Sequence, residues 1–143
     1  MIGVDTNLLI AWLNSAHPGH PVAKLWFESQ SASNDLVLCE LVLTELYGLL
    51  RNPKLWASPL LAPAAVAMIQ TLRQHPHWEL VDYPGGLMGK IWPHASAPQF
   101  AYRRIYDARL ALTLRHHGVT EFATANVKDF QDFGFTRVWN PLA

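Results

Sequence analysis

Four carboxylates stand beside apolar segments of the sequence, where a charged side chain is costly unless something uses it. The first of them, Asp5, directly follows the short apolar run 2–4 and precedes an apolar helical pattern. A carboxylate held between two buried segments without a compensating partner is expensive. Carboxylates that gather at one point repel one another and need a cation to remain ionised together. The four candidates are Asp5, Glu45, Asp107 and Asp129.

Such a cluster predicts a divalent cation and hydrolytic chemistry. Oxygen-only ligands suit Mg²⁺ or Mn²⁺ better than Zn²⁺. The reaction best served is metal-assisted hydrolysis of a phosphodiester, because the metal activates a water and stabilises the leaving oxygen. The competing interpretation is that each acid is a helix N-terminal residue that complements the helix dipole. That interpretation suffices for any one acid alone, whereas the four together favour the metal site.

Short polar and basic side chains accompany the acids. Thr6 and Thr124 suit the orientation of a carboxylate or a metal-bound water, and equally a plain role as a helix cap or a strand-end hydroxyl. Asn7 is expected to hydrogen-bond locally near Asp5. The seven histidines are interpreted as structural. Three arginines around Asp107 match phosphate geometry, and they also suit an acidic partner or solvent exposure: Arg103, Arg104 and Arg109.

The elements that must position these side chains alternate between strand and helix. Short apolar runs predict the strands, and helical periodicity of the apolar residues predicts the segments between them. The segment 83–99 holds three glycines and three prolines and stays undecided between a short helix and a long loop. The predicted strands are 2–4, 36–39, 78–81, 121–124 and 137–139. Five helices are predicted: one that begins after the cap Thr6, one from about 22 to the loop 31–34, one from 40 that ends before Pro53, one over 64–72 after Pro63, and one over 105–117 before Gly118.

This alternation predicts an α/β fold, with a central, mainly parallel sheet of about four to five strands and helices on both faces. In such a sheet the strand ends and the helix starts that follow them share one edge. That edge would gather Asp5, Glu45 and Asp129. Asp107 joins them only if the helix that carries it points its N-terminus toward the same edge.

Length and composition indicate one globular domain. A chain of 143 residues is expected to form a single domain, 1–143. Eleven basic residues balance eleven acidic ones, so the composition does not favour a strongly basic nucleic-acid binder. The single Cys39 excludes an internal disulfide and a cysteine-based zinc site, and it fits a cytoplasmic location. No apolar stretch reaches the length of a bilayer span, so no membrane association is expected.

Four motifs follow one another along nearly the whole chain. They are Val4-Asp5-Thr6-Asn7-Leu8-Leu9-Ile10; Thr44-Glu45-Leu46 followed by Arg51-Asn52-Pro53-Lys54; Tyr106-Asp107-Ala108-Arg109-Leu110-Ala111; and Ala123-Thr124-Ala125-Asn126-Val127-Lys128-Asp129-Phe130 followed by Trp139-Asn140-Pro141-Leu142. No single motif is specific. In this order and at these separations, the sequence resembles the PIN-domain ribonucleases, and specifically the VapC-type toxins of bacterial toxin–antitoxin pairs.

The resemblance implies a PIN-like three-layer fold and an endoribonuclease that uses Mg²⁺ or Mn²⁺ to hydrolyse RNA. It gives Asp5, Glu45 and Asp107 the first three acidic roles, with Asp5 and Asp107 as direct metal ligands. Where many members have a fourth Asp, this chain has Asn126, which brings a carbonyl oxygen but no charge. Asp129 is then the nearest carboxylate. Whether the site holds one metal or two stays open.

The resemblance also implies partners. They are a second copy of the chain in a homodimer, a small cognate VapB-type antitoxin that blocks the site, and operator DNA bound only through that antitoxin. The three arginines would then contact RNA or an acidic antitoxin tail. Because of Asn126, an alternative is a PIN-like binding module with weakened catalysis that acts through its antitoxin and operator DNA. A phosphatase of the haloacid-dehalogenase type needs Asp-x-Asp, and position 7 is Asn7, so that class fits poorly.

Overall fold

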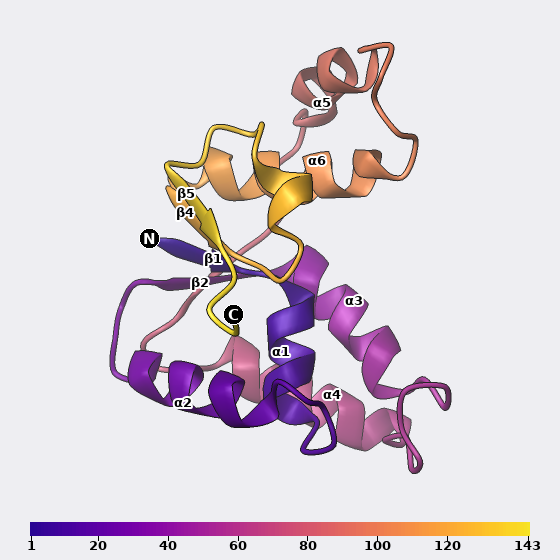
Figure 1. Cartoon of the computed structure of the whole chain (residues 1–143), viewed down its shortest axis with the longest axis vertical. Helices are drawn as coiled ribbons and strands as arrows, with labels where there is room; N and C mark the ends of the chain where they lie inside the picture. Colours follow the sequence, from indigo (N-terminus) through magenta and orange to yellow (C-terminus); the bar gives the residue numbers. More distant parts are fainter.

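Six α-helices, five strands and one 3-10 helix make up the chain, and the computed structural model describes all residues 1–143 (Figure 1). The order along the chain follows the alternation that the sequence predicts. The strands are β1 (Ile2–Val4), β2 (Leu36–Cys39), β3 (Glu79–Val81), β4 (Glu121–Ala123) and β5 (Arg137–Trp139), and the helices are α1 (Thr6–Leu13), α2 (His20–Gln30), α3 (Glu40–Leu50), α4 (Ala62–Arg73), α5 (Met88–Ala95), α6 (Arg104–His116) and the 3-10 helix η1 (Val127–Phe130).

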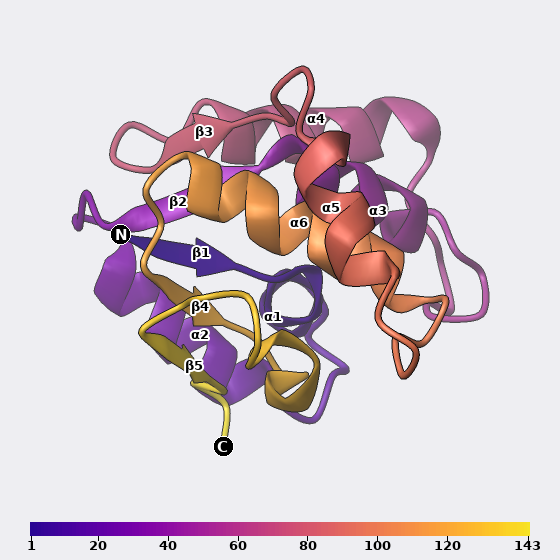
Figure 2. The ribbon, with the colours of Figure 1, turned by 90° about the horizontal axis from the view of Figure 1, so that it is seen from above.

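The five strands form one parallel sheet in the order β3-β2-β1-β4-β5. The central strand β1 pairs with β2 on one side and β4 on the other, so that Gly3 lies opposite Val37 and Phe122. Helices α1 to α4 lie on one side of the sheet; α6 covers the other face, and α5 packs on α6 (Figures 1 and 2). The predicted α/β fold with a parallel sheet of about four to five strands is confirmed.

The hydrophobic core lies on both faces of this sheet. Strand β2 is buried along its whole length, as expected for an apolar run covered by helices on both sides. One cluster of 27 buried hydrophobic residues joins the strands to the helices. Full burial of a large side chain such as Phe27 or Leu114 contributes about 1.5–3 kcal/mol, so the packed sheet is a rigid base for whatever its edges carry.

Helix α6 packs closely on β1 because Gly3 has no side chain. A Cβ at Gly3 would lie 2.9 Å from Leu114 Cδ1. Since α6 leads into β4, which is parallel to β1, the helix runs opposite to the strands. Its first turn, with Asp107, therefore lies at the carboxyl edge of the sheet. The N-terminus of the helix thus points toward the edge that holds the other acids, as the prediction for Asp107 requires. The helix ends before Gly118, as predicted, and the φ of 81° at that residue suits glycine.

The structure differs from the prediction at the start of α1, and it resolves the undecided segment 83–99. The N-cap of α1 is Asp5, so the prediction of Thr6 as the cap is wrong by one residue. The reason is that the Asp5 backbone is extended and its Oδ1 accepts the N–H of Thr6 at 2.8 Å. The undecided segment 83–99 contains α5, with Pro93 inside the helix.

None of the helices has the length and apolar character needed to cross a membrane.

Candidate functional site

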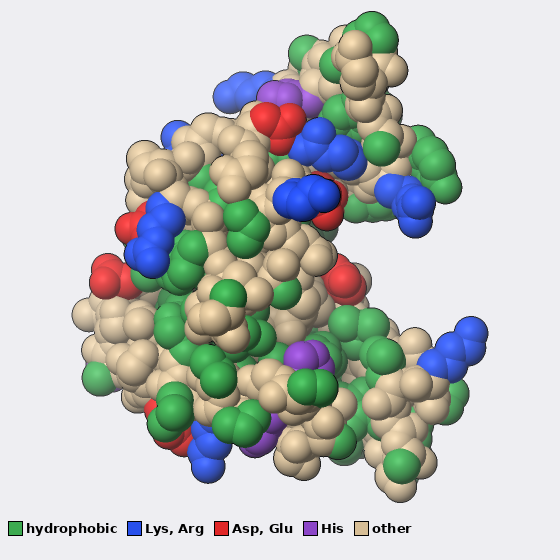
Figure 3. All heavy atoms as spheres, in the orientation of Figure 1, with side chains coloured by type: hydrophobic (Ala, Val, Ile, Leu, Met, Phe, Trp, Pro, Cys, Tyr) green, Lys and Arg blue, Asp and Glu red, His purple; other side chains and the backbone are tan.

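A cavity of about 660 Å³ opens where the carboxyl edge of the sheet meets α3 and α6. The molecule is hollowed on this side, between the arm that carries α5 and the arm that carries α3, and an acidic side chain shows on the inner wall (Figure 3). Of the four predicted acids, Asp129 is the one that does not line the cavity. The polar side chains that line it are Asp5, Asn7, His17, Thr44, Glu45, Tyr106, Asp107, Arg109 and Asn126.

Asp5 is fixed by three hydrogen-bond donors at the end of β1, where it is only 7% exposed. Its Oδ1 accepts the backbone N–H of Thr6, while its Oδ2 accepts the hydroxyl of Thr124 at 2.6 Å and the amide of Asn7 at 3.2 Å. Asn7 in turn accepts the backbone N–H of Ala125 at 3.1 Å. The parallel pairing of β1 with β4 brings these residues together, since each strand ends beside the other.

These contacts act against the effect of burial on Asp5. Burial raises the pKa of Asp5, and the hydrogen bonds from Thr124, Thr6 and Asn7 lower it. The negative charge of Asp129 raises the pKa further. The donors therefore stabilise the ionised form of a carboxylate that its surroundings disfavour.

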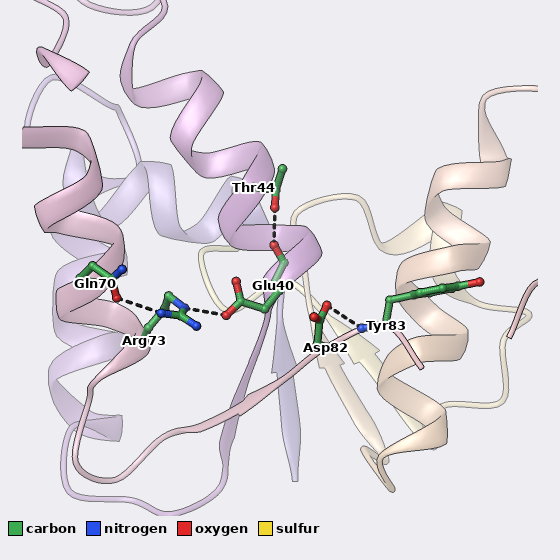
Figure 4. Close-up of polar contacts among 6 residues, drawn as sticks. All are labelled: Glu40, Thr44, Gln70, Arg73, Asp82 and Tyr83. Atoms are coloured by element: carbon green, nitrogen blue, oxygen red, sulfur yellow. Dashed lines mark hydrogen bonds and ion pairs between the residues drawn. The ribbon is translucent and has the colours of Figure 1, made fainter. Parts of the chain in front are cut away.

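Glu45 enters the cavity from α3. The hydroxyl of Thr6 donates to Glu45 Oε2 at 3.2 Å, which links the start of α1 to the middle of α3. Burial raises the pKa of Glu45, the charge of Asp5 raises it further, and the Thr6 hydrogen bond lowers it. Helix α3 is itself anchored at its first residue, because Arg73 Nε at the end of α4 donates to Glu40 Oε1 at 2.6 Å (Figure 4).

Asp107 is the most strongly perturbed acid of the cavity. Burial, followed by the charges of Asp129 and Asp5, raises the pKa of Asp107 to about 6. Arg104 opposes this shift, and Glu45 adds to it. Three carboxylates on three different elements thus act on one another across a single site.

Two residues, Asn126 and Asp129, are candidates for the fourth acidic position. Asn126 lines the cavity and is held by its backbone N–H, which donates to Thr124 Oγ1 at 3.0 Å. Asp129 lies three residues later in the exposed turn η1, where its charge still raises the pKa values of Asp5 and Asp107. Asn126 thus offers an oxygen at the cavity, and Asp129 offers a negative charge nearby.

The three arginines have different surroundings. Arg104 is engaged, since it forms an ion pair with Asp132 at 2.6 Å and donates to the backbone carbonyl of Asp129 at 3.0 Å. Arg103 is exposed, with its guanidinium over the ring of Tyr102. Arg109 alone of the three lines the cavity.

The donor chemistry of the site fits a hard divalent cation. All the candidate ligands are oxygens, and a cation would relieve the burial and the mutual repulsion that together raise the pKa of Asp107. No three Asp, Glu, His or Cys side chains lie close enough together to enclose an ion by themselves. Mg²⁺ keeps several waters and needs only one or two carboxylates, so Asp5 and Asp107 suffice for it.

His17 and Tyr106 are among the cavity residues to which the sequence alone assigns no functional role. His17, interpreted from the sequence as structural, lines the cavity, and its Nδ1 accepts the N–H of Gly19 at 2.9 Å. Tyr106, next to Asp107, lines the cavity and is 74% exposed. For Tyr106 the adjacent acid was an available signal, whereas nothing local distinguishes His17 from the other six histidines.

The fold is that of a PIN domain, and the family model described as "PIN domain" matches residues 2–135. Ribonuclease VapC24 of Mycobacterium tuberculosis is 46% identical over 142 residues, which span 99% of this chain and 97% of that protein. The chain therefore belongs to the PIN-domain family, among its VapC-type ribonucleases.

Solved structures share the fold. The crystal structure of Mycobacterium tuberculosis VapC20, described as a sarcin–ricin loop cleaving toxin, superimposes with a TM-score of 0.70 at 22% identity, over 95% of this chain and 97% of that one. A toxin–antitoxin complex from Klebsiella pneumoniae gives a TM-score of 0.64 at 16% identity, over 99% of this chain and 98% of that one. At these identities the likeness speaks for the fold alone.

Proposed function

We propose that this protein is an endoribonuclease that depends on Mg²⁺ or Mn²⁺ and acts as the toxin of a VapBC-type toxin–antitoxin pair. The observation that carries the proposal is that Asp5, Glu45 and Asp107, from three separate elements, line one cavity in a member of the PIN-domain family. The 46% identity to Ribonuclease VapC24 supports RNA as the substrate.

Each acid has a distinct part in this proposal. Asp5 and Asp107 would hold the metal ion, which would supply activation of a water and stabilisation of the leaving oxygen of the phosphodiester. Glu45 is oriented by Thr6 and is the carboxylate available to accept a proton. Asn126 contributes an oxygen to the metal or to its waters.

The surrounding side chains support these roles. Thr124 and Asn7 keep Asp5 in place through their hydrogen bonds, and Thr6 does the same for Glu45. Asp129 adds negative charge that favours a bound cation. Arg103, Arg104 and Arg109 supply positive charge on the α6 side for RNA or for an acidic antitoxin segment.

The proposed partners are a VapB-type antitoxin, operator DNA through that antitoxin, and a second copy of the chain. Support for the antitoxin comes from the fold shared with the Klebsiella pneumoniae toxin–antitoxin complex. The proposed location is the cytoplasm, where the buried thiol of Cys39 stays reduced. The proposal treats the whole chain, 1–143, as one PIN domain.

RNA cleavage with and without metal tests the proposal. We expect cleavage of RNA in Mg²⁺ or Mn²⁺, no cleavage in EDTA, and a loss of at least about a hundredfold in Asp5→Asn and in Asp107→Asn, since even outer partners of metal ligands are worth up to that much. Asp35→Asn is the matched control, because Asp35 is an exposed carboxylate outside the cavity.

Two results would contradict the proposal. Cleavage that persists unchanged in Asp5→Asn or Asp107→Asn would overturn the site assignment. Wild-type protein that binds its antitoxin but neither binds metal by calorimetry nor cleaves RNA would establish the binding module without catalysis, an alternative for which the replacement at Asn126 is the only motive.

A further inference from the structure

One face of α6 carries an unusual set of side chains at the mouth of the acidic cavity. Tyr106, Arg109 and Leu110 all line the cavity, and residues three or four apart in a helix share a face. Asp107 lies on the same turn. The cavity is therefore bordered, right beside a proposed metal ligand, by an aromatic ring and a guanidinium.

Arg109 is positively charged but has no anionic partner. It takes part in none of the four ion pairs of the chain, and its buried Nε has no hydrogen-bond partner. Its guanidinium lies over the ring of Tyr83, with Cζ 4.4 Å from the ring centre. Tyr83 follows β3, and its side chain extends toward α6 (Figure 4).

This arrangement prepares Arg109 for an anion. Stacking on an aromatic ring fixes the plane of a guanidinium and leaves its N–H edge free. That edge matches the oxygens of a phosphate in a two-bonded geometry. Arg104 cannot serve in the same way, because Asp132 and the carbonyl of Asp129 already accept hydrogen bonds from its two terminal NH2 groups.

Tyr106 presents a free aromatic face. It is 74% exposed, and Tyr102, in the turn just before α6, is 81% exposed. No other aromatic ring stacks on either of them, whereas the buried rings of the core pair with one another, as Phe122 does with Phe130. Exposed rings of this kind stack on unpaired bases at about 1–3 kcal/mol per base.

We propose that Tyr106 and Arg109 form a nucleotide subsite next to the proposed cleavage centre, in which a base stacks on Tyr106 and the neighbouring phosphate binds Arg109 held by Tyr83. The subsite rests on the proposed ribonuclease function and deepens it. It accepts a nucleotide only when the base is unpaired, because a base inside a duplex has no free face for the ring. Tyr106 thereby selects for the conformation of the RNA, and Arg109 fixes its register.

An acidic segment of a protein partner is the other conceivable occupant of the same surface. The observations favour RNA, because a carboxylate would use Arg109 and leave the exposed face of Tyr106 unexplained. A nucleotide uses both groups at once, at the three-residue spacing that the helix provides.

Binding of RNA without metal tests the subsite. The background is Asp5→Asn in EDTA, which prevents cleavage, and the probe is a fluorescent, unstructured 12-nucleotide RNA followed by anisotropy. Its comparison probes are an RNA of the same length whose central nucleotides lack bases and a 12-base-pair RNA duplex. Thermal unfolding by circular dichroism verifies that each variant is folded.

The Arg109 arm measures one phosphate contact. We expect Arg109→Gln to weaken binding about tenfold and to lower the slope of log affinity against log salt by about 0.7, on both the intact and the abasic strand. Arg137→Gln is the matched control, because Arg137 also lies over an aromatic ring, at 3.9 Å from that of Trp139, but does not line the cavity. Its slope should equal that of the background protein.

The Tyr106 arm measures stacking. We expect Tyr106→Ala to weaken binding to the unpaired RNA about tenfold and to leave the abasic RNA and the duplex unaffected. Tyr106→Phe, which keeps the ring, should bind within about twofold of the background protein. Trp92→Ala is the control, because Trp92 is 58% exposed but lies on α5 outside the cavity lining.

The outcomes separate this inference from the proposed function. If the wild type cleaves RNA but Tyr106→Ala and Arg109→Gln bind RNA like their controls, the subsite is overturned and the ribonuclease stands. If the two variants keep RNA affinity and lose antitoxin affinity, the surface belongs to the antitoxin and the subsite is again overturned. If the wild type neither binds nor cleaves RNA, both fail.

Discussion

At the scale of single residues, Asp5 and Asp107 differ in the surrounding groups that stabilise their ionised forms. Asp5 is nearly buried, but three donors point at its oxygens, two from Thr6 and Asn7 in α1 and one from Thr124 just after β4. For Asp107 the opposing influence is the charge of Arg104, and the charges of Asp129, Asp5 and Glu45 add to burial, so its pKa rises to about 6. Asp107 is therefore the acid whose ionisation most needs a cation.

A pH-dependent stability effect follows for the metal-free protein. The pKa of Asp107 is about 6 in the folded chain against 3.8 for an unperturbed Asp, so the folded state binds the proton more tightly. The stability contributed by protonated Asp107 is present below pH 4 and lost as the pH rises to 6. In EDTA at pH 7, Asp107→Asn should therefore raise Tm by about 3 °C, which corresponds to about 1 kcal/mol in a chain of this size.

Thermal unfolding between pH 4 and pH 7 measures this effect. The difference in Tm between Asp107→Asn and wild type should shrink toward zero at pH 4, and Asp35→Asn, an exposed acid outside the cavity, should show no such trend. A variant that is less stable than wild type at pH 7 in EDTA would contradict the electrostatic strain on Asp107. A gain in stability from removal of a functional residue is the usual signature of an active site.

At the scale of elements, the site depends on how closely α6 lies on β1. The strands follow from their apolar runs, and β1, β2 and β5 were predicted with the bounds they have. Helix α5 was not, because its segment mixes glycine and proline with apolar residues, and Pro93 inside the helix opposes a helical prediction. The close contact of α6 with β1 depends on Gly3, which a local pattern does not single out.

Substitution of Gly3 tests this packing. The methyl group of Gly3→Ala would meet Leu114 Cδ1 at 2.9 Å and Phe122 Cδ2 at 3.2 Å, so we expect a loss of about 1–3 kcal/mol in the free energy of unfolding. Urea denaturation measures it. Gly48→Ala is the matched control, because nothing lies within 4 Å of a Cβ there and α3 should gain about 0.5–1 kcal/mol. Equal urea midpoints for the two variants would contradict the tight contact.

At the scale of the whole molecule, the cavity exists because the sheet joins three distant parts of the sequence at one edge. Its acids come from the residue after β1, from α3 and from α6, and the hydrogen bond from Thr124 to Asp5 spans 119 residues of chain. A cation bound there would stabilise the entire fold, since the unfolded chain cannot present these residues together.

Metal binding should therefore raise the Tm of the protein. At a metal concentration of 100 times Kd, binding adds about 2.7 kcal/mol, which corresponds to about 5–10 °C here. We expect this gain with Mn²⁺ or Mg²⁺ in wild type and in Asp35→Asn, and no gain in Asp5→Asn or Asp107→Asn. Calorimetry should give one ion per chain, because Asn126 brings no charge for a second one.

Two results would contradict this view. An undiminished rise in Tm in Asp107→Asn would remove that residue from the metal site. Two ions per chain of equal affinity would mean that Asp129 acts as a ligand, although it does not line the cavity in this structure.

The sequence by itself determined the alternation of strands and helices, the parallel sheet and the identity of the candidate acids. These depend on local features: apolar runs, helical periodicity and the place of each carboxylate at a strand end or a helix start. The tertiary structure alone decided that Asn126 rather than Asp129 lines the cavity, that Asp5 caps α1, and that Arg109 stands free over Tyr83 while Arg104 is engaged. Such facts depend on distances between segments far apart in the chain, and these distances are set by packing on the sheet.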